Sequence, residues 1–195
     1  MKKISVLVVF ALLLGFGKMS FAQENAIKLN IFSLAIGTYN VAYERAINDM
    51  NTAQLGVFYL NWGTGSGDYK TTFTGLGITP EFRHYFDESL YGFYVAPFLR
   101  IQSYTLSQDY DDIDTLGNFV TRTAKGNLMT FGGGVVAGHQ WVLGEHFTID
   151  LFLGPQYSAG TAKVSDDSDD PDYEFSTGAF SGFGIRWGMT FGFAF

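Results

Sequence analysis

Large apolar residues alternate with small or polar ones along most of the chain after residue 22. The clearest case is the last segment, residues 182–195. On one face lie Phe183, Ile185, Trp187, Met189, Phe191, Phe193 and Phe195, and on the other Gly182, Gly184, Arg186, Gly188, Thr190, Gly192 and Ala194. A period of two residues is typical of a β-strand with one apolar face.

Seven further segments show the same period. It is clear in residues 76–86, 91–104 and 147–157, and weaker in 26–34, 39–47, 52–62 and 128–142. No segment keeps a helical period for several turns. We therefore predict an all-β fold of eight strands, and an even number is what a closed antiparallel bacterial barrel requires.

The connections between these segments alternate in length. Those at residues 48–51, 87–90 and 143–146 are tight, whereas those at 63–72, 105–127 and 158–178 are long; the first, near Gly37 and Thr38, is short. In an up-and-down barrel this pattern places the tight turns at one rim and the long loops at the other. A soluble sandwich has no reason to separate its connections in this way.

The size of the apolar side chains indicates which face is outside. Eight strands enclose an interior that side chains fill, so rings as large as Trp187 do not stack there, whereas glycines fit. We therefore expect the apolar face to meet lipid, with no open channel inside. In lipid the first and last strands must pair with each other, because hydrocarbon offers no hydrogen-bond partner to the backbone N–H and C=O groups of an unpaired strand. Pro80, Pro97 and Pro155 donate no hydrogen bond and should each require a bulge or bend.

Rings near the strand ends predict two aromatic girdles at the membrane surfaces. The girdle at the tight-turn rim would hold Tyr43, Phe86, Tyr91, Trp141, Phe147, Phe193 and Phe195. The girdle at the long-loop rim would hold Tyr39, Tyr59, Trp62, Phe73, Tyr104 and Tyr157.

The first 22 residues predict export. Lys2 and Lys3 precede an apolar run over residues 4–16, and small residues end at Ala22. This order is that of a signal peptide cleaved after Ala22, with a retained helical anchor as the alternative. Residues 23–195 would then form one barrel domain.

The charge of that domain excludes some partners. Removing Lys2, Lys3 and Lys18 from the 12 basic residues leaves 9 against 19 acidic ones, a net charge of −10. Nucleic-acid binding needs clustered Lys and Arg, so we expect no such partner. The chain has no cysteine, so neither a disulfide nor a lipid-modified cysteine is available.

With these features the mature chain resembles the small outer-membrane β-barrel family, of the type of outer membrane protein X and the transmembrane domain of outer membrane protein A. The terminal stretch Phe191-Gly192-Phe193-Ala194-Phe195 adds to the likeness. The resemblance implies a multi-pass protein of the bacterial outer membrane, in contact with its lipid and with periplasmic termini. It also implies that Phe195 is a signal read by the barrel-assembly machinery. We expect a monomer without a cofactor.

Seven charged residues fall on the inward face of the predicted strands: Lys28, Glu44, Glu81, Arg83, Arg100, Asp150 and Arg186. Buried charges require partners, and four bases nearly balance three acids. We predict a charge network that fills the lumen and fixes the register of the barrel. A proton or ion path through the same residues is the alternative.

Three histidines raise the question of catalysis. His84 and His139 fall near the tight-turn rim and His146 in a tight turn, whereas an enzyme acting on outer-leaflet lipid needs its site near the opposite rim. No histidine there is combined with a serine and a carboxylate at defined spacing. We therefore expect interfacial side chains, no catalytic residue and no enzyme.

The long loops are acidic. The run Asp166, Asp167, Asp169 and Asp170 offers carboxylates to a divalent cation but lacks the glycine and spacing of an EF-hand loop. Solvated, mutually repelling loops are the simpler interpretation.

Three function classes follow. The first is a barrel that is not an open porin and acts structurally or through its loops, in envelope stability or adhesion to an extracellular partner. The second is transport of a small solute or ions through a gated lumen, and the third is a lipid-modifying enzyme. A filled, charged lumen and the lack of a catalytic set favour the first.

Overall fold

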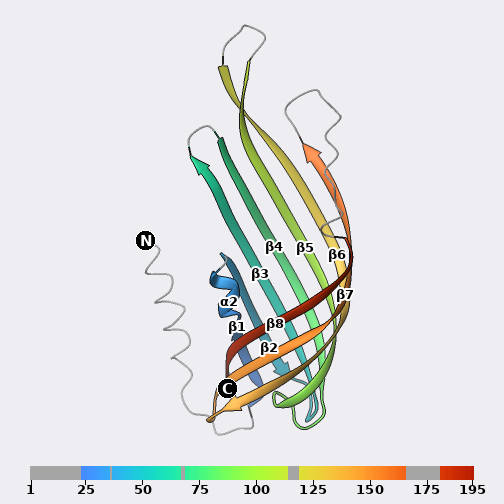
Figure 1. Ribbon diagram of the computed structural model, residues 1–195. Coiled ribbons are helices and arrows are strands. Elements are labelled where there is room, and N and C mark those ends of the chain that lie inside the picture. Colours follow the sequence, from blue (N-terminus) through green and yellow to red (C-terminus); the bar gives the residue numbers. More distant parts are fainter. Residues whose placement is uncertain (1–22, 36, 67–68, 114–118, 166–180) are drawn as a thin grey trace.

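Eight antiparallel strands close into one barrel in the computed structural model, which describes residues 23–35, 37–66, 69–113, 119–165 and 181–195 (Figure 1). Each strand pairs with its neighbours in sequence, and the first pairs with the last. The strands are β1 (Asn25–Leu29), β2 (Thr38–Ala46), β3 (Asn51–Ser66), β4 (Tyr69–Tyr85), β5 (Gly92–Ile113), β6 (Phe119–Leu143), β7 (Phe147–Ser165) and β8 (Gly182–Ala194). The predicted up-and-down barrel of eight strands is confirmed.

The first predicted strand is too long. β1 ends at Leu29, and the helix α2 (Ile31–Ala35) follows it. Asn30 accounts for the change, because its side-chain Oδ1 accepts a hydrogen bond from the backbone N–H of Ser33 at 3.1 Å. An asparagine in this position caps the first turn of a helix. Within the described residues, no helix is long and apolar enough to cross a membrane.

Several other strands extend further toward the long-loop rim than their patterns predicted. β5 and β6 occupy much of the predicted loop 105–127, and β7 continues to Ser165. Beyond the membrane both faces of a strand meet water, so pairing continues although the apolar alternation stops. Threonine, tyrosine and valine in these segments favour extended backbone.

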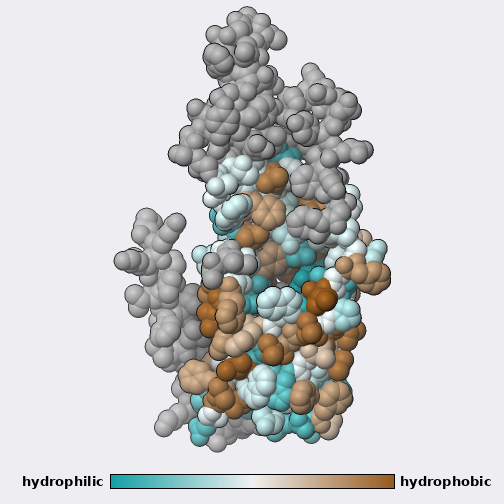
Figure 2. Space-filling view, viewed as in Figure 1, coloured by the Kyte–Doolittle hydropathy of each residue, from teal (hydrophilic) through white to brown (hydrophobic). Residues whose placement is uncertain are grey.

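The two faces of the barrel have the polarity expected for a membrane. Phe183 and Trp187 on the outer face are 90% and 74% exposed, whereas Lys28 and Asp150 inside are 1% and 0% exposed. Exposed apolar side chains occur on strands around the wall, namely Val41, Val57, Ile78, Leu99, Phe131, Leu151 and Ile185, and apolar residues are spread over the lower wall in Figure 2. An apolar outside around a charged inside indicates a transmembrane barrel.

Pairing continues in constant register past all three prolines. Pro80 lacks a partner on β5, Pro97 lacks one on β4 and Pro155 lacks one on β6, yet the pairs on both sides of each gap keep the same register. The missing donors therefore interrupt the ladder locally, without an inserted residue. Of the two predicted responses, a bulge is excluded at these positions.

The pairs also give the stagger of the strands. Starting from Ala26, they lead once around the barrel through Glu44, Gln54, Glu81, Phe98, Gly134, Gln156 and Gly184. Ala26 itself pairs with Ala194, ten residues beyond Gly184. A stagger of this kind accompanies strands tilted by roughly 35–45° from the barrel axis.

The lipid-facing wall generates a depth-dependent prediction. Leu151 lies four residues into β7, within the apolar belt, and is exposed. Leu151→Arg should therefore lower the unfolding free energy by about 2–4 kcal/mol in liposomes, measured by urea titration. Leu143→Arg is the matched control, because Leu143 ends β6 at the tight-turn rim. At this rim Leu143→Arg should lower the unfolding free energy by only about 0–1 kcal/mol. Equal losses of unfolding free energy at both positions would contradict the assignment of the outer face to lipid.

Candidate functional site: a charged lumen and the cavity above it

The lumen near the tight-turn rim holds a cluster of six charged side chains from five strands. They are Lys28 on β1, Glu44 on β2, Glu81 and Arg83 on β4, Asp150 on β7 and Arg186 on β8. Alternation sends each of them inward, and the constant register brings them to similar depth. Three positive and three negative charges leave the cluster neutral, as burial requires.

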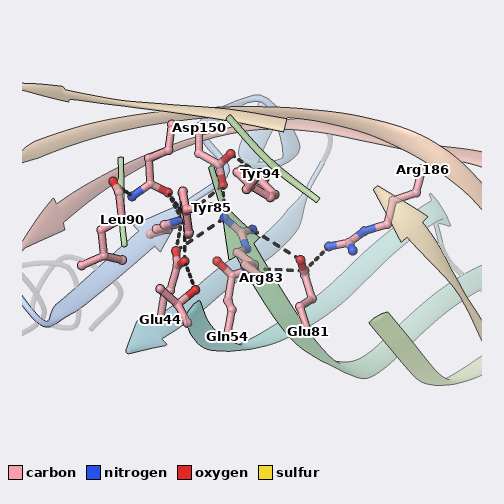
Figure 3. Close-up of polar contacts among 12 residues, drawn as sticks. Glu44, Gln54, Glu81, Arg83, Tyr85, Leu90, Tyr94, Asp150 and Arg186 are labelled. Carbon is pink, nitrogen blue, oxygen red and sulfur yellow. Dashed lines mark hydrogen bonds and ion pairs between the residues drawn. The ribbon is translucent and has the colours of Figure 1, made fainter. Parts of the chain in front are cut away.

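Arg83 connects the two halves of the cluster (Figure 3). Its Nη1 lies 2.7 Å from Asp150 Oδ2 and 3.4 Å from Glu44 Oε2, and its Nη2 lies 3.4 Å from Glu81 Oε2. Lys28 closes the other side, in contact with Glu44 and with Asp150 Oδ2 at 3.2 Å. Each of these buried charges has at least two polar partners.

Arg186 forms the upper edge of the cluster. Its Nη2 pairs with Glu81, and its guanidinium carbon lies 4.3 Å from the ring centroid of Phe98 and 4.8 Å from that of Phe152. Glu81 also accepts a hydrogen bond from Gln54 Nε2 at 3.1 Å. Two aromatic faces thus hold this cation where the lumen becomes less polar.

Uncharged side chains that we did not predict as site residues complete the cluster. Tyr94 OH donates to Asp150 Oδ1 at 2.7 Å, and Tyr85 OH donates to Glu44 Oε1 at 2.8 Å. Thr52 donates to Glu44, and Gln140 accepts from Lys28 and donates to the carbonyl of Leu90 at 2.8 Å. The alternation places both tyrosines inside, but only the three-dimensional register shows which carboxylate each one reaches.

Arg100 is the predicted network residue that the structure leaves apart. It donates hydrogen bonds to neutral oxygens, Thr79 Oγ1 at 3.4 Å and Gln156 Oε1 at 3.2 Å, and its guanidinium carbon lies 5.8 Å from the ring centroid of Phe98. Among the described residues it has no carboxylate within 4.0 Å, unlike the other three lumen cations. The described part of the lumen therefore carries one excess positive charge, above the neutral cluster.

A cavity of about 270 Å³ lies beside Arg100. Lys28, Glu81 and Arg186 line it below, and Phe58 and Tyr104 line it on the side of the long-loop rim. The structure thus combines charged, polar and aromatic groups in one space inside the wall.

The aromatic side of the cavity corrects the predicted upper girdle. Phe73 and Tyr104 point into the lumen and stack with ring centroids 5.5 Å apart, and Tyr104 also contacts Phe58 at 6.0 Å. Trp62 pairs directly with Phe73 and shares its face of the sheet. The rings find room because β4 carries Gly77, where a Cβ atom would collide with the Phe58 ring.

The histidines do not assemble into a site. His84 Nδ1 contacts Asn51 at 2.8 Å, and His146 Nδ1 contacts the carbonyl of Ala194 at 2.9 Å. His139 lies against Phe93 and Trp141, with centroids 4.3 and 4.2 Å apart. None of these contacts joins a histidine to a serine.

The remaining predicted residues lie elsewhere. Phe195 exchanges backbone hydrogen bonds with Asn25 at 2.8 and 3.0 Å, at the junction of β1 and β8; its role as an assembly signal stays a prediction. Asp166, Asp167, Asp169 and Asp170 lie outside the described residues. Within the described part of the chain, no group of three or more His, Asp or Glu side chains is arranged to hold a metal ion.

A family model described as a protein of unknown function, DUF3575, matches residues 7–175. The chain belongs to this family. No curated protein matches it. Among solved structures it is similar to CarO of Acinetobacter baumannii, with 11% identity, a TM-score of 0.47, and coverage of 91% of this chain and 100% of that one. It is also similar to a major outer membrane protein from Thermus thermophilus, with 15% identity, a TM-score of 0.46, and coverage of 90% and 100%.

The buried cluster leads to a stability prediction. Arg83→Met leaves Glu44 and Asp150 with one cation fewer, so the unfolding free energy should fall by about 3–5 kcal/mol. The control is Arg45→Met, because Arg45 on β2 is exposed and its loss should change stability by about 0.5 kcal/mol or less. Urea titration in liposomes measures both variants, and an unchanged midpoint for Arg83→Met would mean that the cluster does not hold the fold.

Proposed function

We propose that this protein is an outer-membrane barrel with its tight turns and termini in the periplasm. It neither conducts solutes as a porin nor catalyses a reaction, and it acts through the segment that it presents outside the cell. The closed lumen carries this proposal. Side chains from β1, β2, β4, β7 and β8 meet across the barrel near the tight-turn rim, where a channel would have to pass.

The cluster opposes transport along the barrel axis. Arg83, Lys28, Glu44 and Asp150 are almost fully buried and bonded to one another. Opening a path would separate these pairs and leave charges without partners, which costs several kcal/mol for each ion. Eight-stranded barrels of this size are in general filled by their own side chains.

The hairpin of β5 and β6 supports the proposed outward role. These strands have 22 and 25 residues, whereas about 10 residues suffice to cross a membrane. The described pairing of β4 with β5 ends at Gln108, and that of β6 with β7 ends at Lys125. Between these points β5 and β6 pair with each other and with no other described strand, and the hairpin extends past its neighbours (Figure 1).

A two-stranded ribbon that pairs with no third strand in the described ranges suits recognition. Its outer backbone groups are available to an added strand from a partner, a common mode of protein recognition. Its sequence includes Asp109, Asp111 and Asp112, so a partner with basic residues would be favoured. Of the functions open to a filled barrel, interaction at this ribbon is therefore the one that we propose.

Conductance tests the closed lumen. In planar lipid bilayers the purified protein should show no porin-like conductance, because the charge cluster blocks the axis. Glu44→Ala combined with Arg83→Ala removes two central side chains and should raise the conductance above that of the wild type. Steady porin-like currents from the wild-type barrel would contradict the proposal and favour transport.

Shortening the hairpin tests the interaction role. Replacing residues 109–123 with Asn-Gly leaves Gln108 and Ala124 as the closing pair, and Asn-Gly favours a tight hairpin turn. The barrel should keep its heat-dependent mobility in detergent gels, while adhesion of expressing cells to surfaces should be lost. The control replaces residues 65–70 with Asn-Gly, which shortens the neighbouring hairpin and should leave adhesion unchanged. Unchanged adhesion with the shortened β5–β6 hairpin would refute the role.

A further inference from the structure

The junction between the first and last strands covers only part of the wall. β1 pairs with β8 at four positions, from Ala26 with Ala194 to Leu29 with Phe191, and the backbone bonds between Asn25 and Phe195 continue this ladder at the tight-turn rim. Beyond Leu29 the chain turns into α2, so no described strand pairs with residues 182–190 of β8 on this side. Above this point the described wall has a gap between β8 and β2, and α2, which contacts both strands, borders the gap at the end of β1.

The gap lies at membrane depth. Trp187 is eight residues from the C-terminus and Phe191 is four, which places them about 20 and 10 Å above the tight-turn rim at ordinary strand rise and tilt. The apolar belt of such barrels is about 25 Å tall. The gap therefore faces lipid and leads neither to the periplasm nor to the exterior.

The backbone along the gap is polar. Phe195 donates its N–H to Asn25 on β1, and alternate residues of a strand direct their N–H groups to the same side. Ile185, Trp187 and Met189 therefore direct theirs into the gap. Such groups are tolerated at membrane depth where they line a cavity rather than contact lipid.

The cavity beside Arg100 reaches this gap. Its lining includes Val41 and Trp187, whose side chains belong to the outer, lipid-facing set. It also includes Asn30 and Asn40, which border the gap where β1 ends. Figure 2 views the barrel from the side that β8 crosses in Figure 1, and it shows a recess with hydrophilic residues in the middle of that side. The lining of the cavity thus extends from charged residues in the lumen to residues of the outer wall.

The chemistry of this space favours an anion. Among its charged lining residues, Glu81 is paired with Arg186 and Arg83, and Lys28 with Glu44 and Asp150. Among the described residues, Arg100 donates hydrogen bonds to neutral oxygens and lies over the ring of Phe98, and no carboxylate pairs with it. Arg186 Nε and Nη1 and Thr190 Oγ1, also in lining residues, are buried and have no hydrogen-bond partner in the part of the chain that the structure describes. A carboxylate beside Arg100 would supply the missing negative charge and accept these donors after a small side-chain shift.

We propose that the cavity binds the headgroup of a single-chain amphiphile with a carboxylate, which enters from the membrane through the gap between β8 and β2. A volume of about 270 Å³ is below the roughly 300–1,000 Å³ typical of pockets for drug-sized ligands. The headgroup and a few carbons fit inside, and the rest of the alkyl chain lies past Val41 and Trp187 in lipid. This binding site is separate from the proposed role of the β5–β6 hairpin.

Trp187 provides the readout. In a variant with Trp62→Phe and Trp141→Phe it is the only tryptophan left. With this protein in phosphatidylcholine nanodiscs at pH 8, 11-bromoundecanoate should quench its fluorescence saturably. The uncharged 11-bromoundecanol should quench it only in proportion to its concentration in the lipid, and excess acetate should not reverse quenching by the acid.

Two further changes in the same background locate the site. Arg100→Met removes the anion's partner and should raise the concentration of 11-bromoundecanoate needed for half-saturation by about tenfold or more. Arg45→Met, outside the barrel, should leave that concentration unchanged. Gly56→Leu fills the cavity, and the nearest atoms to a Cβ at Gly56 are at 3.6 Å, an ordinary contact. It should abolish saturation while the heat-dependent gel mobility persists.

Three results would overturn the proposal. Quenching by the acid that never saturates would show simple partition into lipid. Equal affinity with Arg100→Met and Gly56→Leu would place the acid elsewhere, and displacement by acetate would indicate a small-anion site without use of the lateral gap.

Discussion

Hydrocarbon offers no hydrogen-bond partner to a peptide group. This constraint explains both the closure of the barrel and the polarity of its interior. Strands within the membrane must pair on both sides, which forces closure, and closure with an apolar exterior leaves the inside for everything polar. The tight-turn half of the barrel follows the rule fully, because β1 supplies the last ladder to β8. Where β1 ends, the exposed backbone borders a cavity instead.

Closure also determines what the interior must contain. A filled lumen places charged side chains a few ångströms apart, so their number and sign have to match before the strands can close around them. Arg83 illustrates this, since it contacts carboxylates from three strands, β2, β4 and β7. Glu81 lies on the same strand as Arg83, but Glu44 and Asp150 constrain how β2 and β7 align with β4. The cluster therefore favours one register among those that the backbone alone would allow.

The architecture was largely predictable because alternation and connection length are local signals. The inward face of β4 places Glu81, Arg83 and Tyr85 in the lumen without knowledge of the other strands. The partners were not predictable, because Lys28 meets Asp150 only after the stagger around eight strands is fixed. The same limit hid the separation of Arg100 from the carboxylates.

Other errors came from places where the local signal fails. The mostly apolar residues 31–35 fit a strand as well as a helix, and the hydrogen bond from Ser33 N–H to Asn30 Oδ1 favours the helix. Toward the long-loop rim, alternation no longer separates two environments, so it did not show how far β5 and β6 extend. Tyr104 shares a face with Arg100, and Phe73 shares one with Glu81. The predicted girdle placed both rings by their distance from the strand ends and ignored this phase. The cavity depends on both of these features, and neither it nor the gap could have been predicted from the pattern.

The constant register through β3, β4, β5 and β6 limits how such a sequence can vary. Inserting one residue within a strand reverses the faces of everything beyond it, turning Arg83 or Asp150 toward lipid and rings toward the lumen. Two residues restore the faces but move each side chain along its strand, away from its partner. Changes in length are therefore confined to the connections, and the chain can diversify at its rims while the wall between them keeps a fixed residue count.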